Sequence, residues 1–158
     1  MAAGIFIDLG NGIKGESIQE GHADKIVASS VQWGVGRTVA NYAGGSRETS
    51  TPNFSEMTFT KMFDISSNDI AKAASNGTNL GEVTITFRKD SGEAGIDYLI
   101  YTLANVLITH YSVSSGGETP SESVSLNYSK IKSEYKKLAN EHSEAGENDF
   151  EYDVQTQT

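Results

Sequence analysis

The stretch from Val83 to Val113 most constrains the fold, because it combines the clearest strand pattern of the chain with its largest apolar surface. Apolar and polar residues alternate from 83 to 88, the period of two that is typical of a strand with one face in a core. A glycine-bearing turn at 89–95 follows, so this region predicts a β-hairpin. The second arm, 96–113, is apolar on both faces, and at roughly 3.3 Å per residue it is too long for an ordinary strand unless it bends.

A strand that is apolar on both faces normally lies between two layers. We therefore expect one face of residues 96–113 to meet the core of this chain and part of the other to meet another subunit. The residues predicted to lie at this subunit interface are Leu99, Tyr101, Leu103 and Leu107.

Length and charge limit the possible partners. A chain of 158 residues is long enough for one domain, so a single domain over residues 1–158 is predicted. Its 12 basic and 21 acidic residues give a net charge of −9, which repels phosphate backbones and anionic lipids. The longest mainly apolar run, 98–108, falls short of the ~20 residues that span a bilayer. We therefore expect neither a nucleic-acid partner nor insertion into a membrane. The absence of cysteine excludes disulfides and thiolate metal sites.

The N-terminal region predicts a strand and then a turn. Residues 1–9 lack a basic segment and a long apolar one, so no secretory signal peptide is expected, and any export would use another route. Residues 10–15 match the pattern G-x-G-x-x-G of dinucleotide sites. However, Gly21 interrupts the segment where a helix would have to begin, so the pattern predicts a plain turn.

A second strand is predicted over residues 25–35, with Trp33 as a core or interface residue. The polar stretch 36–53 that follows is unusually long for a loop in a compact domain, and such loops are either functional or disordered. If the loop is functional, we expect an arm that reaches a neighbouring molecule; if it is not, we expect a flexible surface loop. The anchors of the arm would be Val39, Tyr42 and Arg47, because aromatic residues and arginine are enriched at contact centres.

The remaining segments predict further strands and one helix. A strand is expected over 54–63, with the stem of Lys61 along the sheet and its ammonium group in water. A helix is expected over 66–77, strands over 123–129 and 150–154, and an acidic loop over 140–149 within the acidic segment 140–158. Several strands with one short helix predict a mainly β fold, a two-sheet sandwich or barrel.

Catalytic and metal-binding patterns are thin. The three histidines lack HExxH spacing and no G-x-S-x-G motif is present, so no catalytic residue, cofactor or metal is predicted. His22 lies in an acidic turn that could hold a metal, but solvated charge is the favoured interpretation. A hydrolase that uses Glu16 and Asp64 ranks lowest, because nothing in the sequence brings the two carboxylates together.

A set of short motifs then carries a resemblance that covers nearly the whole chain. In order they are Gly15-Glu16-Ser17, Trp33-Gly34, Phe59-Thr60-Lys61 with Asp64, Thr86-Phe87-Arg88-Lys89 and Leu126-Asn127. In this order and spacing the chain resembles the haemolysin-coregulated protein (Hcp) family, the tube proteins of bacterial type VI secretion.

The resemblance implies a phage tail-tube-like fold with a short helix at the side of two sheets. It further implies homohexameric rings that stack into a hollow tube, with a contractile sheath, a spike protein at the tip and small effector proteins in the lumen. The chain would be cytoplasmic before firing and secreted afterwards. In this scheme the lumen position is Gln32, larger than the small polar residue frequent in relatives. The arm 36–53 would stack rings through Val39, Tyr42, Arg47 and Glu48.

The alternative from another class is a monomeric β-sandwich module that binds a ligand such as a carbohydrate. Exposed aromatic residues that converge on one loop end would favour this module. An apolar strand face left uncovered in the monomer would favour the ring.

Overall fold

The computed structural model describes residues 4–40, 45, 47–90, 95–138 and 144–158. Helix α1 spans Ser67–Asn76 and ends at Gly77, whose φ of 65° is the left-handed conformation that suits glycine. In chain order the strands are β1 (Gly4–Asp8), β2 (Ile26–Ala28), β3 (Ser30–Gln32), β4 (Val35–Gly36), β5 (Val39–Ala40), β6 (Glu48–Thr49), β7 (Asn53–Phe54), β8 (Met57–Met62), β9 (Val83–Lys89), β10 (Ile96–Ala104), β11 (Leu107–Ser114), β12 (Ser121–Asn127), β13 (Lys130–Leu138) and β14 (Glu144–Asp153).

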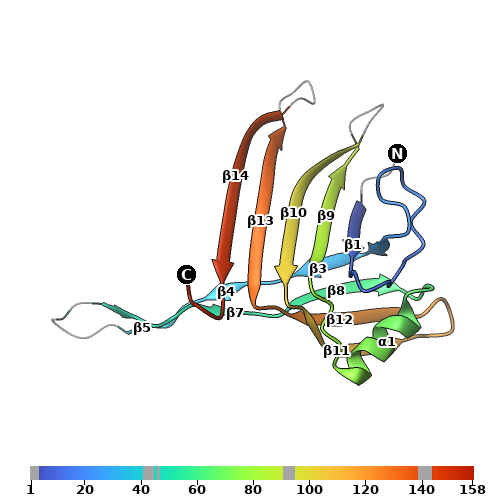
Figure 1. The fold of residues 1–158 in the computed structure, drawn as a ribbon, viewed down its shortest axis with the longest axis horizontal. Helices are drawn as coiled ribbons and strands as arrows, with labels where there is room; N and C mark the ends of the chain where they lie inside the picture. Colours follow the sequence, from blue (N-terminus) through green and yellow to red (C-terminus); the bar gives the residue numbers. More distant parts are fainter. Residues whose placement is uncertain (1–3, 41–44, 46, 91–94, 139–143) are drawn as a thin grey trace.

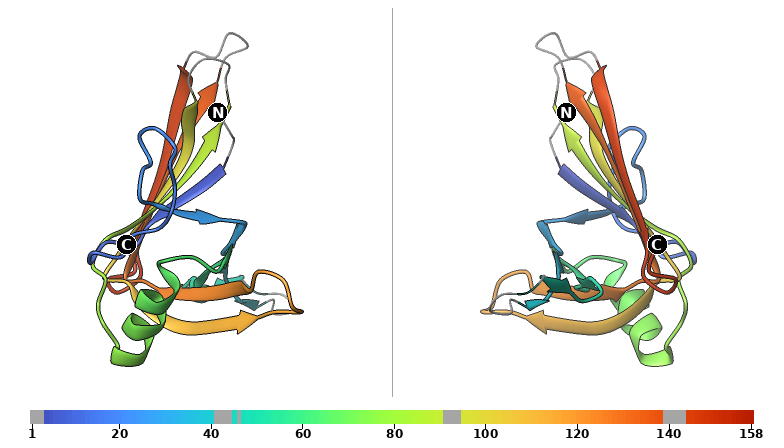
Figure 2. Two further views of the ribbon diagram at one scale, coloured as in Figure 1. Left: turned by 90° about the vertical axis from the view of Figure 1, so that its right-hand side faces the viewer. Right: turned by 90° about the vertical axis from the view of Figure 1, so that its left-hand side faces the viewer.

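Two antiparallel sheets form the body of the fold. The large sheet has the strand order β14-β13-β10-β9-β1-β2, and the small sheet has the order β11-β12-β8-β3. The large sheet rises steeply from one side of the small sheet, and α1 packs beside β11 (Figures 1 and 2). The predicted mainly β, two-sheet fold with one short helix is confirmed. It is an open sandwich and not a closed barrel, because the two sheets diverge above their junction (Figure 2).

The core lies where the two sheets and the helix meet. Alternate residues of each strand face it, as the period of two requires. Residues with at most 1% exposure include Ile7, Val83, Ile85, Leu103 and Ile131 from the large sheet, Met57, Phe59, Val124 and Leu126 from the small sheet, and Ile70 from α1.

The hairpin predicted at the start of the 83–113 stretch is confirmed, since β9 pairs with β10 from Val83↔Leu103 to Lys89↔Ile96. Residues 96–113, the second arm, do not form one long strand. The chain breaks at Asn105, which has a φ of 53°, and continues as β11 in the other sheet. Asparagine is one of the few residues that tolerate this left-handed conformation. The two-faced apolar pattern therefore belongs to a chain that crosses from one layer to the other.

Two other predicted segments are corrected in the same way. Residues 25–35 are not one strand, because β2 belongs to the large sheet, β3 to the small sheet and β4 to a separate two-stranded ribbon with β7. The predicted acidic loop 140–149 is a strand from Glu144 onward, since β14 pairs with β13 along its length. Exposed edge strands tolerate such acidic residues well, because charges prevent edge-to-edge pairing.

The predicted position of the Lys61 ammonium in water is wrong. Lys61 is only 1% exposed, and its Nζ donates to Asp64 Oδ1 at 2.8 Å and to Ser67 Oγ at 3.0 Å. The same ammonium forms an ion pair with Glu122, which is 2% exposed and also accepts a hydrogen bond from the Tyr111 hydroxyl. This buried cluster joins β8, β11 and β12 to the start of α1.

The cluster also shifts the pKa values of two of its members, Asp64 and Tyr111. Burial works against ionisation of Asp64, but hydrogen bonds from Lys61 and Ser66 and the Lys61 charge hold the pKa of this carboxyl below its usual value. Burial and the neighbouring Glu122 raise the pKa of Tyr111. Asp64 therefore stays ionised beside Lys61 while Tyr111 stays a neutral donor.

We expect Lys61→Ala to lower the free energy of unfolding by about 3–5 kcal/mol, because it leaves the Glu122 carboxylate buried without its counter-charge. Equilibrium urea unfolding at neutral pH measures the effect. Lys61→Met combined with Glu122→Gln should lose less than Lys61→Ala. The control is Lys132→Ala, which removes a surface partner of Glu134 and should barely move the urea midpoint. A Lys61→Ala loss as small as that of the control would contradict a buried, mutually compensated pair.

A second prediction concerns alkaline pH. Burial raises the pKa of Tyr128 to about 12, and its hydroxyl donates to Ser55 O at 2.8 Å. In the unfolded chain a tyrosine ionises near pH ~10, so the contribution of Tyr128 is complete below that pH and is lost as the pH rises toward the folded value. Tyr128→Phe should therefore flatten the fall of the urea midpoint between about pH 10 and about pH 12. An unchanged slope would contradict this assignment.

Candidate functional site

The core-facing side of the large sheet becomes steadily less covered away from the small sheet. Three cross-strand rows show this. The row Val83–Leu103–Ile131 is fully buried. The next row, Ile7–Ile85–Tyr101–Ser133–Phe150, ends in Phe150 at 43% exposure. The last row, Ile5–Phe87–Leu99–Tyr135, is partly buried at best, with Tyr135 at 46%.

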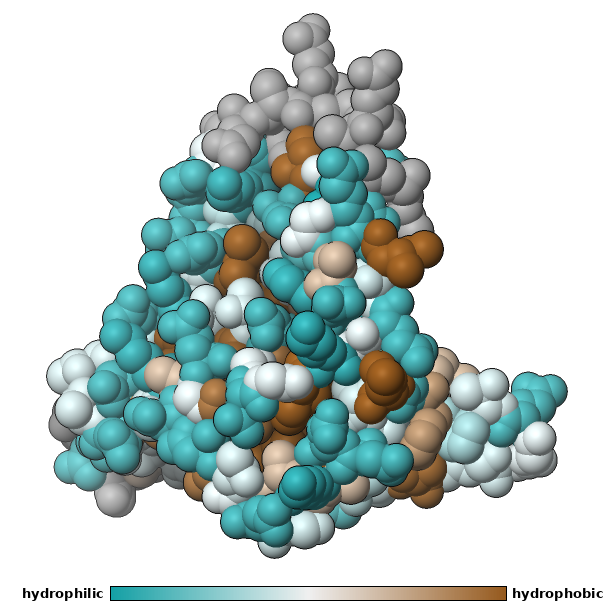
Figure 3. All heavy atoms as spheres, turned by 45° about the vertical axis from the view of Figure 1, so that its right-hand side comes forward, coloured by the Kyte–Doolittle hydropathy of each residue, from teal (hydrophilic) through white to brown (hydrophobic). Residues whose placement is uncertain are grey.

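We give the name uncovered face to the part of the last two rows that lies beyond the small sheet. It consists of Phe87, Leu99, Tyr101, Tyr135 and Phe150. It is apolar and partly exposed within the subunit. From the side of the 10–25 loop, by contrast, the apolar residues lie in separate patches within a larger hydrophilic surface (Figure 3). Contiguous, partly exposed apolar rows such as those of the uncovered face commonly mark a protein contact.

The four residues predicted at a subunit interface fall in three different places. Leu99 and Tyr101 lie on the uncovered face. Leu103 does not, because it has no exposure and packs in the core of this subunit, so it is withdrawn from the predicted interface. Leu107 is 39% exposed but begins β11 in the small sheet, away from the other three.

The opposite side of the large sheet has a different character. Ion pairs join Lys130 Nζ to Glu151 Oε1 at 2.5 Å and Lys132 Nζ to Glu134 Oε1 at 2.6 Å. Pairs this exposed add little stability, but they keep the surface hydrated. At β13 and β14 the large sheet therefore has one charged face and one apolar face, whereas at β1 and β9 the outer side is covered by the 10–25 loop.

The predicted arm is an extended ribbon. Strands β4 and β7 pair at its base and β5 and β6 pair farther out, and the ribbon projects from the body (Figure 1). Val39 is 42% exposed, and Arg47 and Glu48 are exposed as well, whereas Tyr42 lies outside the described residues. A two-stranded ribbon alone is marginally stable in water, so an arm of this shape gains from contact with another molecule.

The small sheet carries a polar face on the side away from the core. Register places its polar residues together, with the apolar Met62 and Leu107 at the strand ends of the same face: Ser30, Gln32, Thr58, Thr60, His110, Ser112, Ser114, Ser121, Ser123, Ser125 and Asn127. Hydroxyl pairs link neighbouring strands, with Ser30 Oγ 2.6 Å from Thr60 Oγ1 and Thr58 Oγ1 3.0 Å from Ser125 Oγ. The predicted lumen residue, Gln32, is exposed on this face.

A shallow hollow of about 560 Å³ opens at the Gln32 end of the polar face, lined by Gln32, Trp33, Gly34, Ser55, Glu56 and Thr58. Trp33 supports its floor and is only partly exposed. Its ring is stacked with Phe54 at 6.4 Å between centroids and meets Tyr101 edge-on at 5.7 Å. These aromatic rings pack at the junction of the two sheets and do not converge on a loop end.

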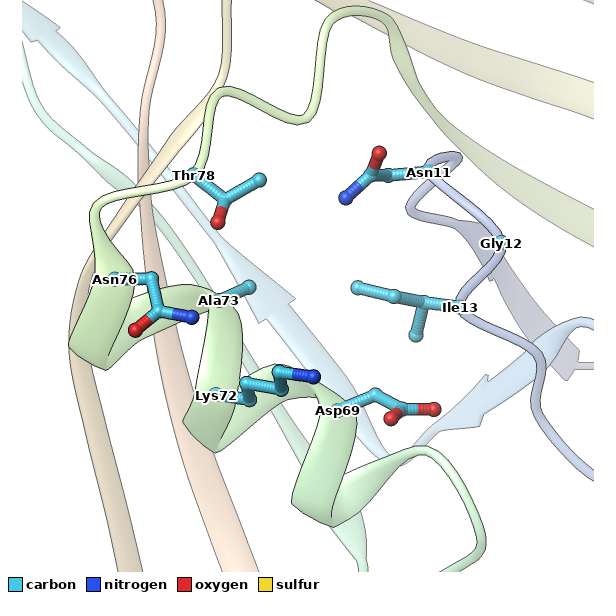
Figure 4. Close-up of a pocket in the computed structure, with 8 residues that line it drawn as sticks. All are labelled: Asn11, Gly12, Ile13, Asp69, Lys72, Ala73, Asn76 and Thr78. Carbon is cyan, nitrogen blue, oxygen red and sulfur yellow. The ribbon is translucent and has the colours of Figure 1, made fainter.

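The glycine pattern at residues 10–15 is explained by packing. Ile13 N donates to Gly10 O at 3.0 Å to close a turn. A Cβ on Gly15 would lie 2.4 Å from Lys25 O, so glycine is required by the neighbouring backbone. A recess of about 210 Å³ separates this turn from the side of α1, with Asn11 and Ile13 facing Lys72 and Asp69 (Figure 4). The plain-turn prediction stands, because no phosphate-binding helix N-terminus follows the glycines.

The prediction that His22 is solvated charge is wrong. It is 4% exposed, its ring stacks on Phe6 at 4.7 Å, and its Nε2 lies 3.0 Å from Asp97 Oδ1. This contact fastens the 10–25 loop to β10 beside a bulge, where Arg88 also meets Asp97. Within the described residues, no group of three His, Cys, Asp or Glu side chains is placed to hold a metal ion.

Neither of the two carboxylates considered for hydrolysis forms part of a catalytic pair. Glu16 is exposed on the 10–25 loop, while Asp64 is engaged by Lys61 and Ser66. Among the residues that the structure describes, no helix is long and apolar enough to cross a membrane.

Comparisons with known proteins agree with this geometry. The family described as "Type VI secretion system effector, Hcp" matches residues 6–135. The protein Hcp1 of Pseudomonas aeruginosa is 34% identical over 137 residues, which cover 85% of this chain and 84% of that protein. A solved structure described as a type six secretion system protein superposes with a TM-score of 0.91 over 99% of both chains at 23% identity. Hcp1 of Salmonella typhimurium superposes with a TM-score of 0.78 at 24% identity, over 99% of this chain and 97% of that one.

The family match spans most of the chain, and the two structural likenesses support the same fold independently. We conclude that this chain belongs to the Hcp family, the non-enzymatic tube proteins of the type VI secretion system.

Proposed function

We propose that this chain is the ring subunit of a type VI secretion tube. Six copies close into a ring, rings stack into a hollow tube, and the tube is exported within a contractile sheath behind a spike protein. Small effector proteins travel in its lumen. The observation that carries this proposal is the uncovered face, an apolar side of the large sheet that the subunit's own small sheet does not cover.

The asymmetry of the subunit favours a ring. The uncovered face is apolar and the opposite side of β13 and β14 is charged, so these two surfaces match poorly, and in a closed ring the uncovered face meets a different patch of the next copy. A contact between two different patches is heterologous, and such contacts close into rings or continue as open stacks. The arm, which projects from the body, is suited to the second kind of contact.

The alternative, a monomeric module that binds a carbohydrate, lacks its expected feature. Such a module needs exposed aromatic rings that converge on one loop end, whereas the exposed rings of Tyr135 and Phe150 lie within β13 and β14 on the uncovered face. Here Trp33, Phe54, Tyr101 and Tyr152 are partly buried and pack on one another, with Phe54 and Tyr152 stacked at 4.7 Å. No specific observation on the described residues favours this function over the ring.

The direct test is the solution mass of the purified protein by light scattering after gel filtration, at two concentrations and two salt strengths. A stable mass near six times 17.0 kDa is expected. A monomer under all conditions would overturn the proposal, since the uncovered face would then remain in water.

Leu99→Asp should lower the solution mass while leaving a folded subunit, because Leu99 lies on the uncovered face. Leu103→Asp should instead abolish folding, because it places an unpaired charge in the core. Light scattering and circular dichroism distinguish the two outcomes. The matched control is Thr102→Asp, which lies between these residues on the charged side, opposite Lys132, and should keep the wild-type mass. Leu99→Asp with an unchanged mass would argue against a contact at this face.

The arm has a separate expected effect. Replacing residues 38–50 with a short Gly-Ser turn should leave the ring mass unchanged, apart from the deleted residues, and should prevent stacking. Electron microscopy of the wild type and the variant at high concentration measures stacking directly. Stacks of equal length in both samples would remove the arm from the contact between rings.

A further inference from the structure

The polar face is nearly free of charge in a protein with a net charge of −9. Lys61 and Glu122, the charged residues in the middle of the small sheet, are in register with each other and turn to the core side. Among the described residues of the four strands, His110 is the one titratable side chain on the polar face. Any further charge at this surface therefore dominates its electrostatics.

Glu56 is that charge. It directly precedes β8, and because Met57 is fully buried, the alternation of the strand places Glu56 on the polar face with Thr58. Its carboxylate forms part of the hollow beside Gln32. Oε2 of Glu56 accepts a hydrogen bond from Thr109 Oγ1 at 2.8 Å, and no cation pairs with it in the part of the chain that the structure describes.

We propose that this hollow receives a lysine or arginine side chain of the carried protein, with the Glu56 carboxylate as its counter-charge. The Gln32 side-chain oxygen and the Thr58 hydroxyl border the hollow and supply neutral acceptors beside the carboxylate. This proposal rests on the proposed function, because it assigns the polar face to the lumen. Six copies in a ring then present six equivalent hollows to one cargo, and several weak contacts act together.

The chemistry of the face argues against other ligands. An anion would meet a carboxylate with no basic residue beside it on these strands. A sugar would lack an exposed aromatic ring, because Trp33 packs against Phe54 and Tyr101. The remaining interpretation is structural, with Glu56 simply fastening the bulge of β11 through Thr109.

The experiment uses two fluorescein-labelled Gly-Ser peptides of equal length, one with three lysines and one with three glutamines, titrated onto the assembled protein by fluorescence anisotropy. We expect tighter binding of the lysine peptide, weakened by added salt. Glu56→Gln keeps an acceptor for Thr109 but removes the charge, and it should weaken the lysine peptide about threefold to fivefold without affecting the glutamine peptide.

Two matched variants separate the interpretations. Thr109→Val removes the hydrogen bond but keeps the carboxylate, so it should bind the lysine peptide like the wild type. Glu118→Gln removes one charge from an exposed turn and should also bind like the wild type. The proposal is overturned if Glu56→Gln binds the lysine peptide unchanged, or if Thr109→Val or Glu118→Gln loses as much as Glu56→Gln.

Light scattering of every variant keeps this test distinct from that of the ring. A monomeric wild type that still discriminates the two peptides through Glu56 would overturn the ring but not the cation site. A hexamer without discrimination would overturn the cation site alone.

Discussion

The structure depends on a mismatch between its two layers. A sheet with an apolar face must bury that face against another layer. In this subunit the long strands β9, β10, β13 and β14 extend beyond the small sheet, so burial falls from complete at Leu103 to partial at Leu99 along one strand. Burying the remaining rows would lower the free energy further, and this burial requires another protein surface. The hydrophobic effect that stabilises the core is thus also the driving force available for assembly.

The period-two pattern predicted much of this arrangement. It identified the β9–β10 hairpin, while the helix was predicted from its capping box and its glycine stop. It also led to the expectation that one face of residues 96–113 meets the core and the other a neighbour, whereas one face of β10 is buried in the core at Leu103 and left uncovered at Leu99. It did not locate the crossing between layers, because alternation continues through Asn105 and Val106 without a visible interruption. The same limit applies to residues 25–35, where one continuous pattern conceals strands in three sheets. Alternation gives the direction of side chains relative to the local backbone but not the sheet to which each segment belongs.

The contacts at and near the candidate site were harder to predict from the sequence, because they join residues that are far apart in the chain. His22 and Asp97 are separated by 75 positions, and neither local segment indicates the other. Lys61 did carry a signal, since a lysine in phase with Met57 and Phe59 must either extend to water or find a buried partner. Choosing between these outcomes requires knowing that Glu122 lies beside it across β8 and β12. Gln32 is exposed, and its lumen role stays a prediction; the hollow beside it also depends on Ser55 and Glu56, which lie between β7 and β8.

One register accounts for both the buried cluster and the neutral polar face. Lys61 and Glu122 are opposite each other and in phase with Phe59 and Val124, so their charges enter the core side as a compensated pair. A shift of β12 by one residue against β8 would turn Glu122 onto the polar face and the serines of β12 into the core. Replacing a buried ion pair by apolar residues is often neutral or stabilising, so stability alone is a weak reason for this pair. The pair is better explained if it also specifies the register, since a one-residue shift would place Ser121 or Ser123 opposite Lys61 and would leave the buried ammonium without its counter-charge. The small sheet thereby keeps a surface of hydroxyl groups on which one carboxylate, Glu56, can determine the electrostatic preference.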